Sequence, residues 1–255
     1  MVHRAAERLG ALVGQRLAAE APHPRAAATG VAAAVDGRTL ERVEAVGKTL
    51  LLRFDGGVVV RSHLRMSGRW RVVPRGAPRS GRPWLVLRGD EWEAVQWNGP
   101  VLVLGEGPVG RLGPDLLAED FDLDRVVRRL RLAGASRPVG EVLLDQTVVA
   151  GIGTMWLAEL LWQARLAPHL AVAAATDEEL RAALGWARRA MRGAVGGSRP
   201  LRAVYRRAGR PCPRCAGPIR AGRIGDDNRA TYWCGRCQRA ERGEDSVPRS
   251  RTRSS

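Results

Sequence analysis

The chain has 255 residues, 45% of them hydrophobic, which is enough for a sizeable core and favours two domains over one. No apolar run approaches the length of a membrane span, so an integral membrane protein is excluded and no membrane partner is expected. The net charge of +16 indicates a polyanionic partner, of which nucleic acid is the commonest. Without a targeting segment, a bacterial cytoplasmic location is expected, associated with the nucleoid through DNA.

Residues 2–13 have apolar positions at helical spacing and predict a short amphipathic helix. After an Ala-rich connection the period changes to two, which predicts strands bounded by turns such as Asn98-Gly99-Pro100. The predicted strands are residues 39–46, 49–54, 57–63, 69–73, 84–88, 91–97 and 101–104. Seven short strands in one region indicate an antiparallel sandwich or barrel.

From Asp115 onward the spacing becomes helical, and four helices are predicted, at residues 124–132, 139–149, 155–165 and 177–193. Thr176 and Glu179 form a capping box at the start of the last one. The charged, Ser-rich segment 239–255 is predicted to be disordered.

Lys48 is the only lysine beside 41 arginines. Arginine keeps its proton in proteins and has a planar fork, so a site that needs an amine or a compact charge does not tolerate the exchange. A functional lysine and a chance surface lysine both fit this observation.

The four cysteines are Cys212 and Cys215, then, after eighteen residues, Cys234 and Cys237. Two C-x2-C pairs at this separation predict a tetrahedral, all-thiolate zinc site with one structural Zn²⁺. Two disulfides are the alternative, but the cysteines are confined to the last fifth of the chain and no signal peptide precedes them. Residues 200–255 hold 14 arginines against 5 acidic residues, so +9 of the net +16 lies here and predicts contact with a phosphate backbone.

The segment from Gly151 to Thr154 is a glycine-rich turn that opens a helix. Free backbone amides at such a helix start can bind phosphate, although the same pattern also occurs in ordinary packing turns.

Short motifs run through nearly the whole chain in a fixed order. They are His3-Arg4-Ala5-Ala6-Glu7-Arg8-Leu9, Gly47-Lys48-Thr49-Leu50-Leu51, His63-Leu64-Arg65-Met66-Ser67-Gly68, Leu112-Gly113-Pro114-Asp115, Leu144-Asp145-Gln146, Gly151-Ile152-Gly153, Val204-Tyr205, Gly209-Arg210-Pro211-Cys212 and Arg229-Ala230-Thr231-Tyr232-Trp233-Cys234. In this order they resemble the formamidopyrimidine-DNA glycosylase and endonuclease VIII family of base-excision-repair enzymes.

The resemblance implies an α+β multidomain fold. It comprises an N-terminal β-sandwich at residues 1–110, a helix-two-turn-helix domain at 111–200, a zinc-finger hairpin at 201–239 and a tail at 240–255. It implies a monomeric glycosylase and abasic-site lyase that acts on damaged double-stranded DNA in the cleft between its domains and flips the damaged nucleotide out.

Residue roles are carried over in the same way. Lys48 matches the family's lysine near the flipped nucleotide, and His63 belongs to a DNA-contact motif. Met66 matches the wedge that fills the gap in the DNA stack, although a core methionine fits the same position. Gly151, Gly153 and Thr154 match the phosphate-binding turn. Arg229 matches the arginine at the tip of the zinc hairpin.

The chain departs from the family at its start. Members begin Met-Pro-Glu-Gly-Asp. Removal of the initiator Met frees the proline amine, which attacks sugar C1′ to form an imine, and the glutamate transfers protons. Met1 aligns after that Asp, so this nucleophile and acid are absent from the chain as written. A start further upstream is favoured over the alternative, a non-catalytic protein that binds damaged DNA, because nearly every downstream DNA-contact motif is present.

Two smaller departures concern the substrate. Thr154 stands where asparagine is usual, which keeps a helix cap with a shorter reach to phosphate. The Arg and Phe gap fillers of the purine-lesion branch are not visible near Asn98 to Val101. The endonuclease VIII-like branch is therefore expected, with the excised base left open.

Overall fold

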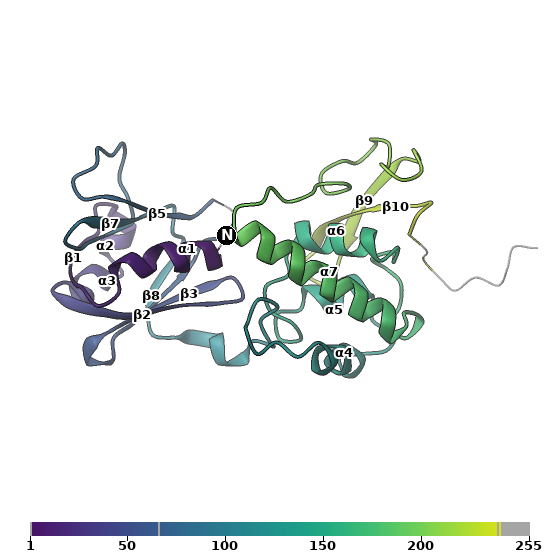
Figure 1. Cartoon of the computed structure of the whole chain (residues 1–255), viewed down its shortest axis with the longest axis horizontal. Helices are drawn as coiled ribbons and strands as arrows, with labels where there is room; N and C mark the ends of the chain where they lie inside the picture. The colour runs from purple at the N-terminus through teal and green to yellow at the C-terminus, as the bar shows by residue number, and fades with distance from the viewer. Residues whose placement is uncertain (1, 66, 239, 241–255) are drawn as a thin grey trace, which may run out of the picture. The chain divides into compact units, whose positions relative to one another are not determined.

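The structure, a computed structural model, describes residues 2–65, 67–238 and 240. It divides into two compact units (Figure 1). The sheet unit comprises Met1–Asp122, Asp145–Ile152 and Arg188–Pro200, and the helical unit comprises Leu123–Leu144, Gly153–Ala187 and Leu201–Ser255. Two segments of the chain therefore return to the sheet unit after the chain has entered the helical unit.

The described part of the sheet unit contains one antiparallel sheet with the strand order β5-β7-β6-β1-β2-β3-β4-β8. Its strands are β1 Arg16–Glu20, β2 Arg38–Val46, β3 Thr49–Phe54, β4 Val59–His63, β5 Arg69–Pro74, β6 Leu85–Arg88, β7 Trp92–Trp97 and β8 Val101–Leu104. Its helices are α1 Val2–Leu9, η1 Gly10–Leu12, α2 Pro24–Ala27, α3 Val31–Val35, η2 Asp55–Gly57 and η3 Gly107–Arg111.

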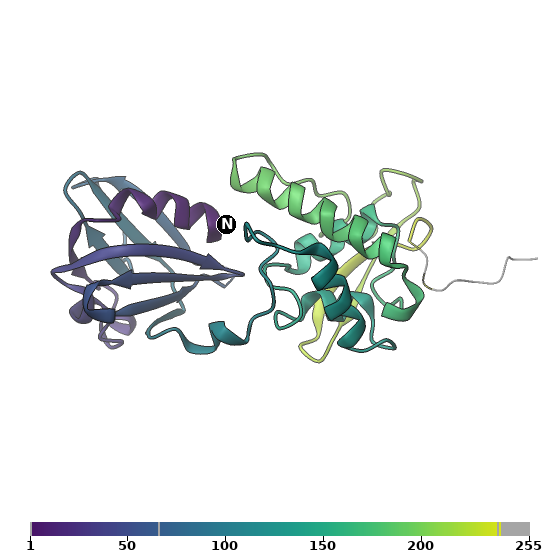
Figure 2. The same cartoon turned by 60° about the horizontal axis from the view of Figure 1, so that its bottom comes forward.

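One hydrophobic core includes residues from strands on both sides of β1. It includes Leu85 and Leu87 of β6 as well as Leu50 and Leu52 of β3, all with no exposed surface. Helix α1 packs against β2, β3 and β5 and adds Leu9 to the core (Figure 2). Burial of each such leucine contributes about 1.5–3 kcal/mol. Because all residues of this core belong to the sheet unit, that unit has a core of its own.

All seven predicted strands are present, and their observed ends lie close to the predicted ones. Strand β1 was missed, although it lies in the middle of the sheet between β6 and β2. Its sequence Arg16-Leu-Ala-Ala-Glu20 has one large apolar residue, and alanine is uncommon in strands, so the segment resembles a connection.

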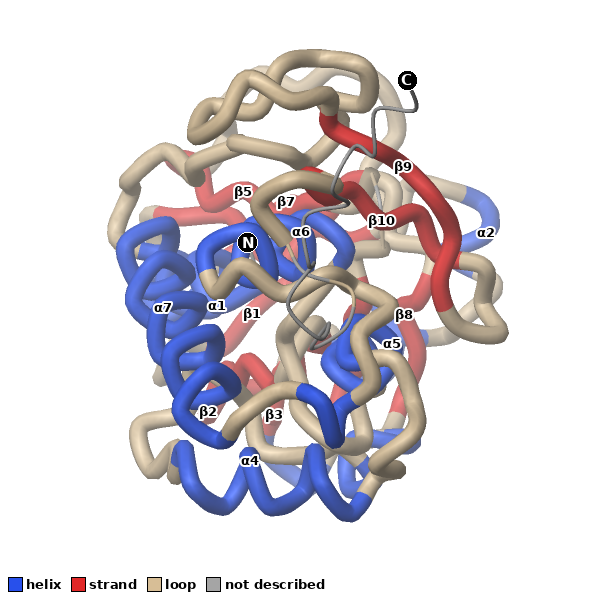
Figure 3. The backbone as a smooth tube through the Cα atoms, turned by 90° about the vertical axis from the view of Figure 1, so that its right-hand side faces the viewer, coloured by secondary structure: helices blue, strands red, loops and turns tan. Residues whose placement is uncertain are grey.

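The helical unit contains α4 Leu123–Leu132, α5 Val139–Leu144, α6 Thr154–Gln163, η4 Val172–Ala174 and the first part of α7 Asp177–Val195. Its hairpin pairs β9 Ile219–Ile224 with β10 Arg229–Cys234, which lie side by side in Figure 3. Helix α6 packs against β10. The antiparallel sheet, helical region and cysteine-bearing hairpin expected from the sequence are confirmed.

The capping box before α7 is confirmed, since the Glu179 amide donates to Thr176 Oγ1 at 3.2 Å and the Thr176 amide donates to Glu179 Oε2 at 2.7 Å. Helix α5 ends five residues earlier than predicted, at Leu144 rather than 149. The Asp145 carboxylate accepts the Thr147 amide at 3.0 Å, and this local turn competes with the helix.

Two predictions concern residues outside the described ranges. Met66 is one, and the segment 239–255, apart from Ala240, is the other. Within the described ranges, no helix has the length and apolar character needed to cross a bilayer.

Candidate functional site

The turn that joins β2 to β3 carries Lys48. Gly47 has a φ of +60°, and a Cβ there would lie 3.1 Å from Cβ of Ala150, so both conformation and space favour glycine. The Gly47 amide donates to Asp115 Oδ2 at 2.7 Å, and the Lys48 ammonium donates to the Ile152 carbonyl at 2.5 Å. The Lys48 amine is therefore held at a defined position.

Asp115 is a buried carboxylate with further partners. Its Oδ2 lies 3.1 Å from His3 Nε2, and its Oδ1 accepts the Leu117 amide at 2.9 Å. Burial raises the pKa of Asp115, but its hydrogen-bond partners outweigh burial and hold this pKa below its usual value. The ionised carboxylate joins the first turn of α1, the Lys48 turn and the segment after η3.

The side chain of Gln146 binds the backbone of Gly151 and Ile152, the first two residues of the glycine-rich turn. Its Nε2 donates to the Ile152 carbonyl at 3.0 Å, and its Oε1 accepts the Gly151 amide at 3.2 Å. Gly151 has a φ of +102°, which side-chain-bearing residues rarely adopt. The Ile152 carbonyl thus receives two donors, from Gln146 and Lys48, and the loop and the Lys48 turn are fixed together.

His63 ends β4 and pairs with Thr49, the residue after Lys48. Its Nδ1 accepts the Arg65 amide at 3.1 Å. Burial lowers the pKa of His63, and the positive charges of Arg65 and Lys48 lower it further, so the ring is neutral at neutral pH. Because Nδ1 accepts a hydrogen bond, the neutral ring carries its proton on Nε2, and this N–H can donate a hydrogen bond to a bound group.

The start of α6 belongs to the helical unit. Gly153 is the extended N-cap residue of the helix, and Thr154 is the first helical residue. No side chain makes a capping hydrogen bond at this N-cap. The expectation that Thr154 caps this helix is wrong, because the cap position is occupied by Gly153. First-turn amides have no acceptor within the helix and lie at its positive end, so this terminus is chemically suited to an anion.

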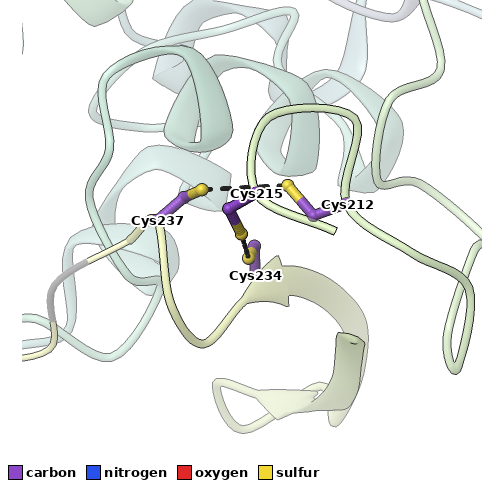
Figure 4. Close-up of side chains that lie close together, drawn as sticks. All are labelled: Cys212, Cys215, Cys234 and Cys237. Atoms are coloured by element: carbon purple, nitrogen blue, oxygen red, sulfur yellow. Dashed lines mark hydrogen bonds between the residues drawn. The ribbon is translucent and has the colours of Figure 1, made fainter. Parts of the chain in front are cut away.

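The four cysteines come together at the base of the β9–β10 hairpin (Figure 4). Their sulfur atoms all lie within 4.8 Å of one another. The Sγ atoms of Cys212 and Cys237 are 3.8 Å apart, and those of Cys215 and Cys234 are 3.5 Å apart. A tetrahedral zinc site with Zn–S bonds of about 2.3 Å has S–S edges of about 3.8 Å. The donor set therefore fits Zn²⁺, and the alternative of two disulfides is not observed because all four are free thiols.

The thiols do not titrate alike. Burial raises the pKa of Cys212, but N–H donors from the Arg214 backbone and the Trp162 indole outweigh burial and lower it to about 6. Burial and the neighbouring thiols raise the pKa of Cys237 to about 12. A divalent cation would hold all four sulfurs as thiolates, because the positive charge removes their mutual repulsion.

Gln238 fixes the second cysteine pair. Its side chain is buried, with Oε1 accepting the Cys234 amide at 2.7 Å and Nε2 donating to the Leu166 carbonyl at 2.7 Å. The backbone of Cys234 is therefore tied through Gln238 to the segment after α6.

Arg229 is the first residue of β10, next to the hairpin turn. Its Nε and Nη2 both donate to Asp227 Oδ2, at 3.1 and 2.5 Å. The guanidinium remains 38% exposed. Because exposed ion pairs contribute little free energy, Arg229 can exchange Asp227 for another anion.

The predicted site residues fall into two groups. Lys48, His63 and Gly151 lie in the sheet unit, and the other described site residues lie in the helical unit. These are Gly153, Thr154, Arg229, Cys212, Cys215, Cys234 and Cys237. The sequence analysis assigned no role to Asp115 or Gln146, although both belong to the motifs shared with the family. Their hydrogen-bond partners become apparent only in the folded chain.

Glu159 was also missed. It has no exposed surface, and its carboxylate accepts the amides of Ala203, Val204 and Tyr205 at 2.9, 3.1 and 2.9 Å. A single acidic residue in the apolar run of α6 is a signal that could have identified it, since buried charges are normally paired or hydrogen-bonded.

Two family models match the chain. The formamidopyrimidine-DNA glycosylase N-terminal domain matches residues 2–98. The formamidopyrimidine-DNA glycosylase H2TH domain matches residues 112–202.

Relatives agree with these models. The chain is 37% identical to the "Probable endonuclease 8 2" of Streptomyces coelicolor, over 79% of this chain and 80% of that protein. It is 36% identical to "Endonuclease 8 2" of Mycobacterium tuberculosis, over 81% and 87%. It is 35% identical to the "DNA-(apurinic or apyrimidinic site) lyase Nei2" of Mycolicibacterium smegmatis, over 93% and 96%.

The fold is likewise similar to that of formamidopyrimidine-DNA glycosylase from Lactococcus lactis in complex with DNA containing an abasic site. The TM-score is 0.78 at 26% identity, covering 93% of this chain and 98% of that one. Since both domain models and relatives above 30% identity extend over most of the sequence, the chain belongs to the formamidopyrimidine-DNA glycosylase and endonuclease VIII family.

Proposed function

We propose that this chain is a base-excision-repair DNA glycosylase with abasic-site lyase activity on oxidatively damaged DNA. The observation that carries the proposal is the similarity, over 93% of the chain, to a protein named DNA-(apurinic or apyrimidinic site) lyase. The endonuclease 8 names of further relatives favour the endonuclease VIII-like branch. Damaged double-stranded DNA is the proposed partner, which the similarity to a glycosylase bound to DNA with an abasic site supports. A bacterial cytoplasmic location is proposed from the bacterial relatives, and a monomer is proposed from the family resemblance alone.

The reaction needs an amine that adds to sugar C1′ as the damaged base leaves, which gives an imine. By family resemblance this amine is that of a proline followed by a proton-transferring glutamate. We assign Lys48 the role of a fixed cation beside the flipped nucleotide. Its bond to the Ile152 carbonyl supports this role, because a pre-positioned charge stabilises developing negative charge without reorganisation.

The DNA backbone is proposed to contact both units. In the Gly151, Gly153 and Thr154 turn, Gly153 and Thr154 would present amides to a phosphate, and Gly151, whose amide donates to Gln146, would set the conformation of the turn. Arg229 would donate to another phosphate after releasing Asp227. His63 would contact the nucleotide next to Lys48. Met66, outside the described residues, is proposed to fill the space left by the flipped nucleotide.

We further propose that Cys212, Cys215, Cys234 and Cys237 hold one structural Zn²⁺. Their sulfur geometry supports this assignment. The metal would fold the hairpin that carries Arg229. The proposed domain limits are 1–110, 111–200 and 201–239, with a tail at 240–255.

Borohydride trapping on abasic duplex DNA tests the proposed chemistry, because reduction converts an imine into a stable covalent adduct. Residues 1–255 should bind this DNA and give little or no trapped complex. The chain extended by Met-Pro-Glu-Gly-Asp ahead of Met1 should give a trapped complex once its initiator Met has been removed and the proline amine is free. In the extended chain, Lys48→Arg keeps the charge and replaces the compact amine, and it should reduce trapping more than binding.

Efficient trapping by the unextended chain would contradict this account, and loss of trapping in its Lys48→Arg variant would then assign the nucleophile to Lys48. Binding without trapping by the extended chain would leave a protein that binds damaged DNA without lyase chemistry.

A further inference from the structure

Helix α6 contacts the cysteine cluster through Trp162. The indole Nε1–H donates to Sγ of Cys212 at 3.4 Å, and both residues are buried, with 5% and 3% of their surface exposed. This sulfur is therefore already a hydrogen-bond acceptor from a neutral donor outside the cluster. The backbone N–H of Arg214 is a second donor to the same sulfur.

Arg214 holds this indole in place. It lies between Cys212 and Cys215 in the chain, and its guanidinium carbon is 3.7 Å from the centroid of the Trp162 ring. Its Nη1 donates to the Trp162 carbonyl and its Nη2 donates to Gln163 Oε1 at 2.6 Å. One arginine thus stacks on the ring and also bonds to the backbone and to the next side chain of α6.

The surrounding contacts make α6 the support on which the cysteine hairpin packs. Trp162 and Ala158 share a small core with the cluster residues Cys212 and Cys234. One turn earlier on the helix, Glu159 binds three successive amides of the segment that leads into the hairpin. The Trp162 ring therefore has little freedom to turn away from the sulfur.

We infer that Trp162 is a positioning residue for the metal, acting as an outer-sphere donor to the Cys212 thiolate, with Arg214 holding the ring in register. This inference rests on the proposed zinc site. A hydrogen bond to a bound thiolate orients the sulfur and withdraws part of its charge, and loss of such outer-shell partners costs about 10–100-fold in metal affinity. A phenylalanine keeps an aromatic ring in the small core but loses the N–H group and part of the indole volume, so a second Trp→Phe variant on the same helix is needed to separate the two losses.

The test uses the purified full chain loaded with Zn²⁺ and, separately, with Co²⁺. Competition with a chromophoric chelator gives the metal affinity, and the sulfur-to-cobalt charge-transfer band reports the thiolates. Trp162→Phe should weaken metal binding by about tenfold or more and shift this band. Trp156→Phe is the matched control, since Trp156 lies on the same helix but contacts Trp186 instead, and it should leave both readouts unchanged.

Arg214→Lys keeps a positive charge and loses the planar stack, so it should weaken binding several-fold, by less than Trp162→Phe. The double variant should lose less than the product of the two single losses, because both act through one sulfur. Far-ultraviolet circular dichroism of the loaded proteins verifies that each variant is folded.

Three results would overturn the inference: wild-type metal affinity and cobalt spectrum in Trp162→Phe, an equal loss in Trp156→Phe, or independent effects of Trp162 and Arg214. Failure of the unmodified chain to bind one equivalent of Zn²⁺ or to give a thiolate band with Co²⁺ would refute the zinc site itself. The two failures are therefore distinguishable.

Discussion

The Lys48 turn and the cysteine cluster hold their functional groups by different means. The Lys48 turn sits on a sheet with its own hydrophobic core and is fixed by hydrogen bonds to Asp115 and Ile152. The cysteine hairpin packs on a much smaller core, in which Cys212 and Cys234 are buried and Cys215 and Cys237 are partly buried. The first arrangement is complete within the chain, whereas the second, as proposed above, is completed by a cation. Changes to the metal site should therefore have larger effects than changes to the Lys48 turn.

The largest effect is expected from Cys234→Ser. Binding of structural zinc supplies about 10–16 kcal/mol of apparent free energy that folds small metal modules. The variant should lose the metal and unfold the β9–β10 hairpin, and its affinity for duplex DNA should fall by about tenfold or more because Arg229 is no longer positioned. Metal analysis, circular dichroism and DNA titration measure the three effects.

Removal of Zn²⁺ from the unmodified chain by chelation should reproduce that loss of affinity, and added Zn²⁺ should restore it. Full DNA affinity in a metal-free preparation would contradict the dependence of the hairpin on metal.

A smaller effect is expected from Asp115→Asn, which weakens hydrogen bonds that an ionised acceptor makes at about 1.5–3 kcal/mol each. The folded-state pKa of Asp115 is below the unfolded value, so its stabilisation is present above about pH 4 and is lost as the pH falls through the folded pKa. Denaturant unfolding at pH 7 should show a lower free energy of unfolding, and the difference from the unmodified chain should shrink as the pH falls below 4. Asp90→Asn, at an exposed turn, should show neither effect.

The smallest effect concerns Arg229. Arg229→Ala should reduce the slope of log affinity against log salt by about one unit, equally for damaged and undamaged duplexes. Asp227→Asn is the matched change in the opposite direction, because it frees the guanidinium and should raise DNA affinity by a few fold. Unchanged salt dependence in Arg229→Ala would place this residue off the DNA.

The sequence predicted most of the sheet because residues such as Leu50 and Leu52 face the core at a period of two. It predicted the metal cluster because the spacing of the cysteines is a local signal. It did not identify Asp115 as the carboxylate that joins His3 to Gly47, because those contacts span 112 and 68 residues of sequence. Nor did it single out Trp162, since a tryptophan in an apolar helix gives no sign that its N–H group meets a sulfur.

Lys48 also allows the sheet unit to be labelled at one side chain with an amine-selective reagent. Amine-selective acylating reagents ignore guanidinium groups, so 41 of the 42 basic side chains are invisible to them and Lys48 is the one side-chain target beside the α-amino group. Its ammonium donates to the carbonyl of Ile152, within the glycine-rich turn. The rate at which this amine is labelled can be measured by mass spectrometry of the one peptide that contains it. This rate therefore reports whether the hydrogen bond between Lys48 and the Ile152 carbonyl is formed.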